Sequence, residues 1–403
     1  MNVRRNAAAL AAIAVIGTAA PAVAAPSPSP KPAIPSGLYG STDPTYDGVW
    51  RQSLALLAQH TVGVRPAAKA VDWLTGQQCA NGAFAAFRAT PEKACDAKVM
   101  VDTNSTAAAV QALAALGGHD DVTGKAVAWL KSVQNKDGGW GYTPGGPSDT
   151  NSTSVVVGAL TAAGQKPAAV EKDGRSAYDA LLKLALPCGG DGAGAFAYQP
   201  DKKGKLAANA DATAAGVVGA LGQGFAAKAA ATAGTAAHCT GSGSATPERA
   251  AANGASYLAG AVAKDGYLTS VLPGSTDQPD YGNTADAVVA LAAQGGAGQA
   301  QKPLRWLEGH FEAWAKQSGP AAYAQLVFAA HATGTDPRAF GGVNLVDRLN
   351  AAGPAPQSAE HKSTHADRKS DAGYGVWWFV GVCLVAGIGV GFLLSGRRKK
   401  QQP

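Results

Sequence analysis

The chain has 403 residues and a formal net charge of +6, with 15% charged residues, 7% aromatic residues and 51 glycines. This length allows one large domain or two ordinary ones, and the abundance of alanine suits closely packed helices because alanine is the best helix former. The positive charge is spread along the chain, and no basic strip is interleaved with aromatic residues. We therefore expect no nucleic-acid partner.

Residues 1–25 have the pattern of a secretory signal peptide. Arg4 and Arg5 precede an apolar core at 7–20, and Ala22-Val23-Ala24 offers a cleavage site of the small-x-small type. Residues 26–44 are rich in proline and are expected to form an extended linker. The sequence therefore predicts an exported protein whose folded domain occupies residues 45–353.

A helical pattern with a polar start and a glycine end recurs about six times, at a spacing of roughly 40 to 70 residues. In the clearest copy, Thr153, Val157, Leu160 and Gly164 share one helical face and follow residues of the capping type at 149–152. The other copies begin at Gln52, Thr106, Thr213, Thr284 and Tyr323. A second helical stretch follows each copy, at 67–78, 124–134, 175–186, 248–262, 301–315 and 342–350.

These segments predict an all-α fold of about six helix pairs. The expected arrangement is a closed ring, an α/α toroid, with the capped helices inside and their partners outside. An open solenoid is the alternative. The spacing of the copies is irregular, with long loops around 187–209, 238–248 and 265–283. Because long loops in a compact domain commonly carry function, this irregularity favours a closed ring with functional loops at one end.

Two of the second helices carry the motif Trp-Leu-x3-Gln-x3-Gly-x-aromatic. Its members are Trp73, Gln78, Gly82 and Phe84 in one copy, and Trp129, Gln134, Gly138 and Trp140 in the other. A copy that begins at Tyr257 lacks the glutamine. We expect the glutamine amide to satisfy free backbone groups at helix ends, the glycine to permit a tight turn and the aromatic ring to pack over the junction.

These motifs resemble the prenyltransferase and squalene-oxidase repeat of the terpene-cyclase and prenyltransferase-β superfamily, over most of residues 45–350. The resemblance implies an α/α toroid. The helix starts Asp102-Thr103-Asn104-Ser105-Thr106 and Tyr281-Gly282-Asn283-Thr284 are also similar to those of cobalamin carrier proteins, which makes a corrinoid a candidate ligand. The family's Asp-x-Asp-Asp acid motif, Asp-x-Cys zinc motif and Cys-Gly-Glu-Gln thioester are absent from the sequence. We therefore predict no catalytic residue, no metal site and no resident cofactor.

The expected ligand contacts are polar residues at helix starts and tyrosines on nearby loops. They are Asp102, Asn104, Asp149, Asn151, Asp211, Asp280, Asn283, Tyr142, Tyr198 and Tyr281. The acidic residues are predicted to converge at one mouth of the ring. Each could instead only cap its helix, and the two roles are compatible because a capping side chain lies at the rim of a pocket. A pair of them could also act as the acid and base of a glycoside hydrolase, and the tyrosines could serve as core.

Four of the five cysteines lie between the predicted signal peptide and the predicted membrane span. In an oxidising compartment this even number predicts two disulfides, and closure of local loops favours Cys79–Cys95 and Cys188–Cys239. Other pairings stay open. A zinc site is not expected, because the sequence has no Cys-x-x-Cys or Cys/His ligand pattern.

The C-terminal segment predicts attachment to a membrane. Residues 354–374 are polar and are expected to form a disordered stalk. Residues 375–396 contain an uncharged apolar run of about 19 residues, long enough to span a bilayer as a helix. The basic tail at 397–403 places the C terminus in the cytoplasm. A single-pass protein with the bulk of its chain outside the cell is expected.

The leading hypothesis is a surface-anchored toroid that binds a small molecule in its central cavity, and that presents it or passes it to a membrane importer. One alternative is an enzyme acting on isoprenoid or carbohydrate substrates, and another is a structural or protein-binding surface module. An apolar cavity without a converging ionisable pair would favour binding. Facing carboxylates would favour an enzyme, and a filled centre would favour the structural role.

Overall fold

The computed structural model describes residues 33–230, 238–241, 245–271, 277–295 and 297–358. Contacts divide the chain into two units, residues 1–358 and 359–403, and all described residues belong to the first. The predicted signal peptide, membrane span and basic tail lie outside the described residues, as does most of the predicted stalk. Within the described part of the chain, no helix is both long and apolar enough to cross a bilayer.

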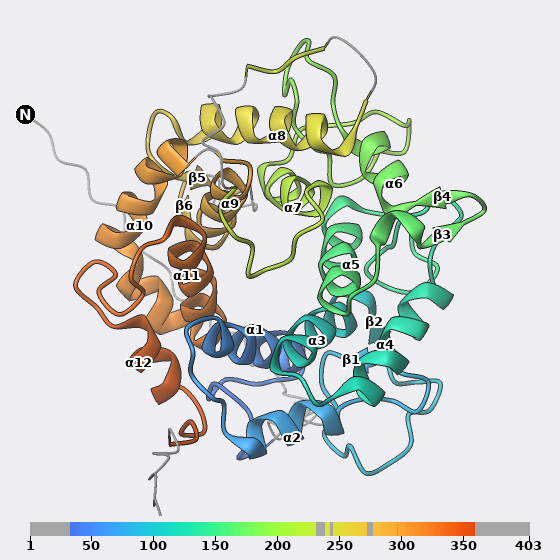
Figure 1. Ribbon diagram of the computed structural model, residues 1–403, viewed down its shortest axis with the longest axis vertical. Helices are drawn as coiled ribbons and strands as arrows, with labels where there is room; N and C mark the ends of the chain where they lie inside the picture. Colours follow the sequence, from blue (N-terminus) through green and yellow to red (C-terminus); the bar gives the residue numbers. More distant parts are fainter. Residues whose placement is uncertain (1–32, 231–237, 242–244, 272–276, 296, 359–403) are drawn as a thin grey trace, which may run out of the picture. The chain divides into compact units, whose positions relative to one another are not determined.

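Six of the twelve helices in the described residues form an inner ring (Figure 1). They are α1 (Gly48–Thr61), α3 (Thr103–Leu116), α5 (Thr150–Ala162), α7 (Ala210–Ala220), α9 (Tyr281–Ala293) and α11 (Pro320–Thr333). Each inner helix contacts the next one in this order, and α11 contacts α1. The ring is therefore closed, and α7 lies opposite α1.

The other six helices lie outside this ring. They are α2 (Ala68–Gly76), α4 (Asp120–Ser132), α6 (Ala177–Leu184), α8 (Pro247–Val262), α10 (Ala297–Ser318) and α12 (Leu345–Ala351). Each one packs against the inner helix that precedes it in the sequence. The six predicted pairs are present, although the outer helices begin and end a few residues away from the predicted positions.

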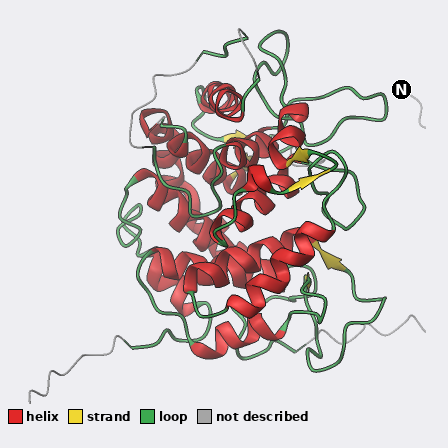
Figure 2. Cartoon of the chain, turned by 45° about the vertical axis from the view of Figure 1, so that its right-hand side comes forward, coloured by secondary structure: helices red, strands yellow, loops and turns green. Residues whose placement is uncertain are grey.

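Three short antiparallel ladders depart from a purely helical fold (Figure 2). Strand β1 (Phe84–Ala85) pairs with β2 (Val101–Asp102), β3 (Glu171–Lys172) pairs with β4 (Arg175–Ser176), and β5 (Leu268–Thr269) pairs with β6 (Pro279–Asp280). A single 3-10 turn, η1 (Pro167–Ala169), precedes β3. Strands of two residues have no alternating pattern to reveal them, so the sequence did not predict them.

The glutamine motif links neighbouring repeats. Gln134 donates from Nε2 to the carbonyl oxygens of Gly138 at 2.8 Å and Val170 at 3.1 Å. In the other copy, Gln78 donates to Gly82 at 3.0 Å and to Val122 at 2.8 Å. The glutamine thus bonds to backbone carbonyls, although these are not only groups left free at helix ends, as the sequence suggested. Its amide satisfies one carbonyl in its own turn and one in the next repeat.

The glycine and the aromatic residue of the motif also have their expected places. Gly138 has φ +90°, and a Cβ atom there would lie 2.1 Å from the carbonyl oxygen of Ser176, so only glycine fits. Trp140 is 1% exposed, and its indole Nε1 donates to the carbonyl of Leu130 at 2.7 Å. Phe84 is fully buried. These aromatic side chains belong to the core between the two layers of helices.

In four inner helices, a threonine in the first turn accepts a hydrogen bond from the backbone of the segment that precedes the helix. The hydroxyls of Thr106, Thr153, Thr213 and Thr284 accept backbone N–H bonds from Phe84, Trp140, Phe196 and Leu268, respectively, at 2.9 to 3.1 Å. The sequence analysis placed these threonines on one helical face but did not predict the bonds. They fix the start of each inner helix against the turn that leads into it.

Both predicted disulfides are present. Cys79, just after α2, is bonded to Cys95, with the two Cα atoms 5.6 Å apart. Cys188, just after α6, is bonded to Cys239, with the two Cα atoms 5.4 Å apart. The longer bridge ties the end of α6 to the segment that leads into α8.

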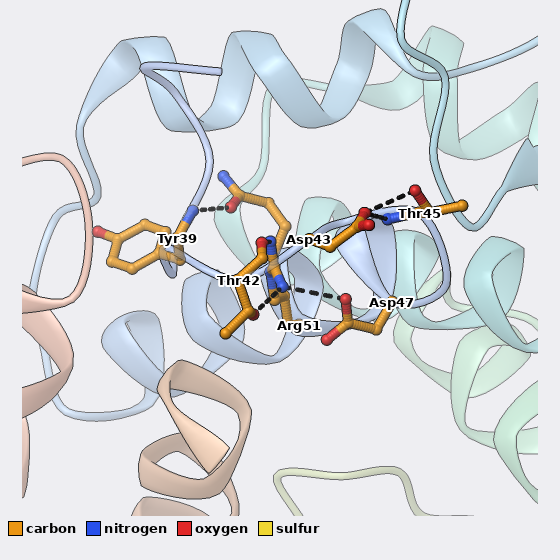
Figure 3. A network of polar contacts seen from close by, with 7 residues as sticks. Tyr39, Thr42, Asp43, Thr45, Asp47 and Arg51 are labelled. Carbon is orange, nitrogen blue, oxygen red and sulfur yellow. Dashed lines mark hydrogen bonds and ion pairs between the residues drawn. The ribbon is translucent and has the colours of Figure 1, made fainter. Parts of the chain in front are cut away.

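A buried arginine attaches the chain ahead of α1 to the first turn of that helix (Figure 3). Arg51 is 1% exposed and donates to Thr42 Oγ1 at 2.8 Å and to Asp47 Oδ1 at 3.0 Å. Nearby, Tyr39 donates its backbone N–H to Gln52 Oε1 at 2.8 Å. These bonds hold the described end of the predicted linker on α1, which carries part of the central cavity.

Candidate functional site

A cavity of about 250 Å³ lies inside the ring and is lined by residues from all six inner helices. Its apolar lining includes Trp50, Leu54, Val218, Phe225, Val289 and Phe328. Its polar lining includes Asn104, Gln111, Asn151, Asp211, Asp286 and Gln325. The centre of the ring is therefore open space with both apolar and polar walls, and is not filled by side chains.

The segment that follows α7, residues 221–230, reaches inside the ring and is here called the strap (Figure 1). The backbone N–H of Phe225 donates to Gln111 Oε1 of α3 at 3.0 Å. A Cβ atom on Gly224 would lie 2.2 Å from the same oxygen, so glycine permits the close approach. The strap thereby brings Phe225 into the cavity lining.

Phe225 completes an aromatic cluster with side chains of two inner helices. Its ring lies 5.3 Å from that of Trp50 on α1, edge to face, and 6.4 Å from that of Phe328 on α11, stacked. All three residues line the cavity. Such a cluster offers a flat apolar surface to a ligand.

The acidic side of the cavity is formed by two carboxylates and two amides. Asp211 of α7 accepts a 2.7 Å hydrogen bond at Oδ2 from Asn151 Nδ2 of α5. Asp286 of α9 accepts from Gln325 Nε2 of α11, with N–O distances of 3.2 and 3.4 Å. Each carboxylate is thus held by an amide from a neighbouring inner helix.

The electrostatics of this side favour a protonated carboxyl group. Burial, together with the negative charges of Asp211 and Asp280, raises the pKa of Asp286 to about 7, against the lowering effect of the Gln325 hydrogen bond. Burial also raises the pKa of Asp211, although the bond from Asn151 lowers it. Asp286 can therefore exchange a proton near neutral pH. This is the converging ionisable pair that the sequence did not reveal.

The predicted ligand residues fall into two groups. Asn104, Asn151 and Asp211 line the central cavity. Asp102, Asp149 and Asp280 cap α3, α5 and α9 by accepting N–H bonds from Ser105, Ser152 and Asn283, at 2.6, 2.6 and 3.0 Å. Burial raises the pKa of both Asp102 and Asp149. Asn283 donates from its amide to Asp280 Oδ2 at 2.8 Å, so these two side chains bind each other.

Asp211 does not cap α7. Asn209 caps that helix instead, with its Oδ1 accepting from Ala212 N at 2.8 Å. Asn209 already satisfies a free N–H of the first turn of α7. The carboxylate of Asp211, the second residue of this helix, is therefore not needed as a cap and is available to the cavity.

The three tyrosines lie in different surroundings. Tyr142 and Tyr198 are partly exposed, and their carbonyls accept from Thr103 N and Thr150 N at the starts of α3 and α5. Tyr281 packs against two tryptophans of α10, tilted against Trp306 and stacked on Trp314, with ring centroids 4.9 and 5.5 Å away. None of the three lines the central cavity.

Tyr142 lines a second, larger cleft of about 550 Å³. Most of this cleft is formed by residues 85–102, together with Thr45 and Tyr46. Asp102 also lines it, and its charge adds to the effect of burial in raising the pKa of Tyr142. Two of the predicted contacts thus belong to this cleft and not to the central cavity.

The roles of Asp286, Gln325 and the aromatic cluster in the cavity were not predicted from the sequence. A signal for Asp286 was available, because it is the only charged residue in α9, which is otherwise almost entirely apolar. A charged side chain on a buried helix is rare unless it has a partner or a function. Among the described residues, no group of three or more His, Cys, Asp or Glu side chains is placed to hold a metal ion.

Comparison with known proteins supports the family resemblance. Residues 52–238 match the squalene-hopene cyclase C-terminal domain. A stretch of 80 residues is 40% identical to drimenyl diphosphate synthase from Streptantibioticus cattleyicolor, which is 20% of this chain and 13% of that protein. The resemblance to the terpene-cyclase superfamily is thus confirmed for the matched residues, and both glutamine motifs lie among them.

Two solved structures are similar at low sequence identity. The ent-copalyl diphosphate synthase from Streptomyces platensis is 16% identical over 71% of this chain and 50% of its own, with a TM-score of 0.47. A sugar epimerase from a ruminal bacterium is 14% identical over 68% of this chain and 80% of its own, with a TM-score of 0.42. The chain spans half of that synthase and a small part of the drimenyl diphosphate synthase.

Proposed function

We propose that this chain, a terpene-cyclase-like toroid, binds a small apolar molecule with a polar head in its central cavity. The observation that carries the proposal is the convergence of all six inner helices on one cavity, with the aromatic cluster and the acidic side in the same space. Ligand sites are typically apolar cavities with a few polar groups that orient the ligand.

The size of the cavity favours a compact ligand. Its volume of about 250 Å³ lies just below the usual range of roughly 300 to 1,000 Å³ for drug-sized ligands. A corrinoid is much larger than such ligands, so the candidate suggested by the carrier-like helix starts is not part of this proposal. A terpenoid-sized hydrocarbon fits the space and the apolar lining better.

The charge of the cavity limits which polar head groups the ligand can carry. The lining residues include Asp211 and Asp286 but no lysine or arginine. A diphosphate group would meet negative charge there without a cation to balance it. The proposed head is therefore uncharged or cationic, which separates the ligand from the diphosphate in the name of the similar synthase.

A second candidate function is proton transfer to a bound substrate, the enzymatic alternative that a converging pair of carboxylates was expected to favour. The observation that favours it is the pKa of about 7 for Asp286, beside a second carboxylate at Asp211. A carboxylic acid that is neutral near pH 7 can act as a general acid, while its neighbour remains ionised. In this scheme Asp286 would donate the proton and Asp211 would stabilise the positive charge that develops.

Binding is tested with the purified full-length protein in detergent. Terpenoid alcohols and hydrocarbons are added while the intrinsic tryptophan fluorescence, to which Trp50 in the cavity lining contributes, and the thermal midpoint are followed. The variant Ala215→Trp fills the cavity, because Ala215 lines it, and Ala162→Trp is the matched control at an exposed position of α5. We expect binding in the wild type and in Ala162→Trp, and none in Ala215→Trp.

Equal binding by all three proteins would overturn the central-cavity site. Product analysis of the same incubations tests the enzymatic candidate. Loss of turnover in Asp286→Asn, with the ligand still bound, would favour it over binding alone.

We also propose that the protein lies outside the cell, held by residues 375–396 and delivering its ligand to a membrane importer. The two disulfides support an oxidising compartment. Protease treatment of intact cells tests this location. Digestion of the toroid without lysis is expected, and full protection would contradict it. Crosslinking in the membrane fraction tests for the importer.

A further inference from the structure

We propose that the acidic side of the central cavity selects a ligand whose head is a protonated amine, and that binding of the amine displaces a proton from Asp286. This inference rests on the proposed binding function and specifies the chemical class of the ligand. It is carried by the hydrogen-bond inventory of the cavity and by the absence of cationic side chains among its lining residues.

The first step is the direction of the amide groups. Asn151 donates from Nδ2 to Asp211, and Gln325 donates from Nε2 to Asp286. Asn151 Oδ1 is left buried without a partner. The protein thus uses these amide donors internally, and acceptor atoms remain for the ligand.

Two further buried polar atoms line the same cavity, a serine hydroxyl, which can accept as well as donate, and an amide oxygen, which only accepts. Ser154 is 5% exposed, and its Oγ has no hydrogen-bond partner. Asn104 Oδ1 is also buried without a partner. A buried polar atom without a partner is costly, so these atoms favour a ligand that brings hydrogen-bond donors. An ammonium group brings three donors, whereas an alcohol brings one.

The second step is charge. Among the described residues that line the cavity there are two carboxylates and no Lys, Arg or His. Among the groups that act on Asp286, Asp211 comes from α7 and Asp280 from the start of α9 itself. The titratable side chains of α11 are Tyr323 and His331, and Lys228 of the strap is exposed and acts on His331. The cationic side chains of α10 are exposed on the outside of the ring. A cation in the cavity would therefore meet net negative charge.

The third step is the proton balance. An ammonium ion binds more tightly to the ionised carboxylate of Asp286 than to the neutral acid. When Asp286 is protonated before binding, RNH3+ therefore binds beside a carboxylate and one proton is released to solution. Because the pKa of Asp286 is about 7, roughly half of the molecules are expected to release a proton at that pH. No bond other than O–H is broken.

The experiment compares three probes with one carbon skeleton: geranylamine, geraniol and geranic acid. Calorimetric titration of the full-length protein at pH 7, in phosphate and in Tris, gives the affinity and the number of protons released. We expect the amine to bind about 10-fold to 100-fold more tightly than the alcohol, the range that a charge-assisted hydrogen bond provides. The acid is expected to bind more weakly than either.

The variant Asp286→Asn should lower the ratio of amine to alcohol affinity, leaving only the part due to Asp211 and the unpartnered acceptors, and abolish the buffer-dependent heat of proton release. Asp72→Asn, on the exposed surface of α2, is the matched control and should behave as the wild type. A circular dichroism melt of each variant establishes that it is folded.

The outcomes separate the two proposals. If geraniol binds as tightly as geranylamine, or if no proton is released, the amine inference is overturned while the binding function stands. Preferential binding of geranic acid would overturn it in the same way. If none of the probes binds, the binding function itself fails, and the inference fails with it.

Discussion

Asn151 donates a 2.7 Å hydrogen bond to Asp211, and this bond joins the second residue of α5 to the second residue of α7. It fixes the direction of the Asn151 amide, so that the other amide atom, Oδ1, remains without a partner. The charge of Asp211 in turn raises the pKa of Asp286 on the next inner helix. Contacts between neighbouring repeats therefore set the chemistry of the cavity.

Replacement of Asp286 by asparagine should stabilise the fold at alkaline pH. The folded pKa of about 7 lies above the ordinary value of 3.8, so between these values the folded state holds a proton that the unfolded state has lost. Stability therefore falls as the pH rises from about 4 to about 7, by as much as ~4 kcal/mol. Asparagine does not titrate and removes this loss.

Urea unfolding of the wild type and Asp286→Asn at pH 3.5 and pH 8 measures this effect, where the two pH values are chosen on either side of the window, roughly pH 4 to 7. The variant should gain up to a few kcal/mol over the wild type at the higher pH and almost nothing at the lower. A difference that does not change with pH would show that Asp286 is ionised throughout.

Replacement of Asp211 by asparagine should lower the pKa of Asp286. Asp211 is the largest charge effect on that group after burial, and its removal leaves Asp280 as the remaining negative neighbour. Carbon-detected NMR titration of the Asp286 carboxyl group provides the measurement. Asp280→Asn is the comparison, and its smaller contribution should give a smaller change. An unchanged pKa in Asp211→Asn would mean that burial alone accounts for the shift.

Replacement of Gly138 by alanine should destabilise the fold strongly. The residue has φ +90°, and its new Cβ would lie 2.1 Å from the carbonyl oxygen of Ser176. Gly145, at φ +76°, has no atom within 4 Å of its Cβ position, so its replacement adds only backbone strain of about 1–2 kcal/mol. We expect Gly138→Ala to cost about 1–3 kcal/mol more, as in overpacking. Equal melting temperatures would contradict the close contact.

Replacement of Gln134 by alanine should cost about 2–4 kcal/mol, because it leaves the carbonyls of Gly138 and Val170 without their donor inside the fold. Gln78 makes the equivalent bonds but is more exposed, so water can partly replace its amide. Gln78→Ala is therefore expected to lose less. Denaturant unfolding of both variants measures the difference, and a larger loss in Gln78→Ala would reverse this explanation.

The repeat pattern alone determined the helix pairs, the capping by Asp102, Asp149 and Asp280, and the role of the glutamine motif. These features depend on residues close together in the sequence, because caps, turns and periodic apolar faces act over a few positions. The two disulfides were also within reach, because each closes a local loop.

The residues that line the cavity could not be predicted from the sequence, because they depend on the tertiary structure. Phe225 meets Trp50 and Phe328, and Gln325 meets Asp286, across separations that no local pattern encodes. The physical reason is ring closure. The helices α3, α5, α7 and α9 are rich in small residues and buried on most of their surface, so their sequences alone do not distinguish the face toward the centre from the faces toward their neighbours. The packing of α11 against α1 and the position of the strap inside the ring determine which face of each helix lines the cavity.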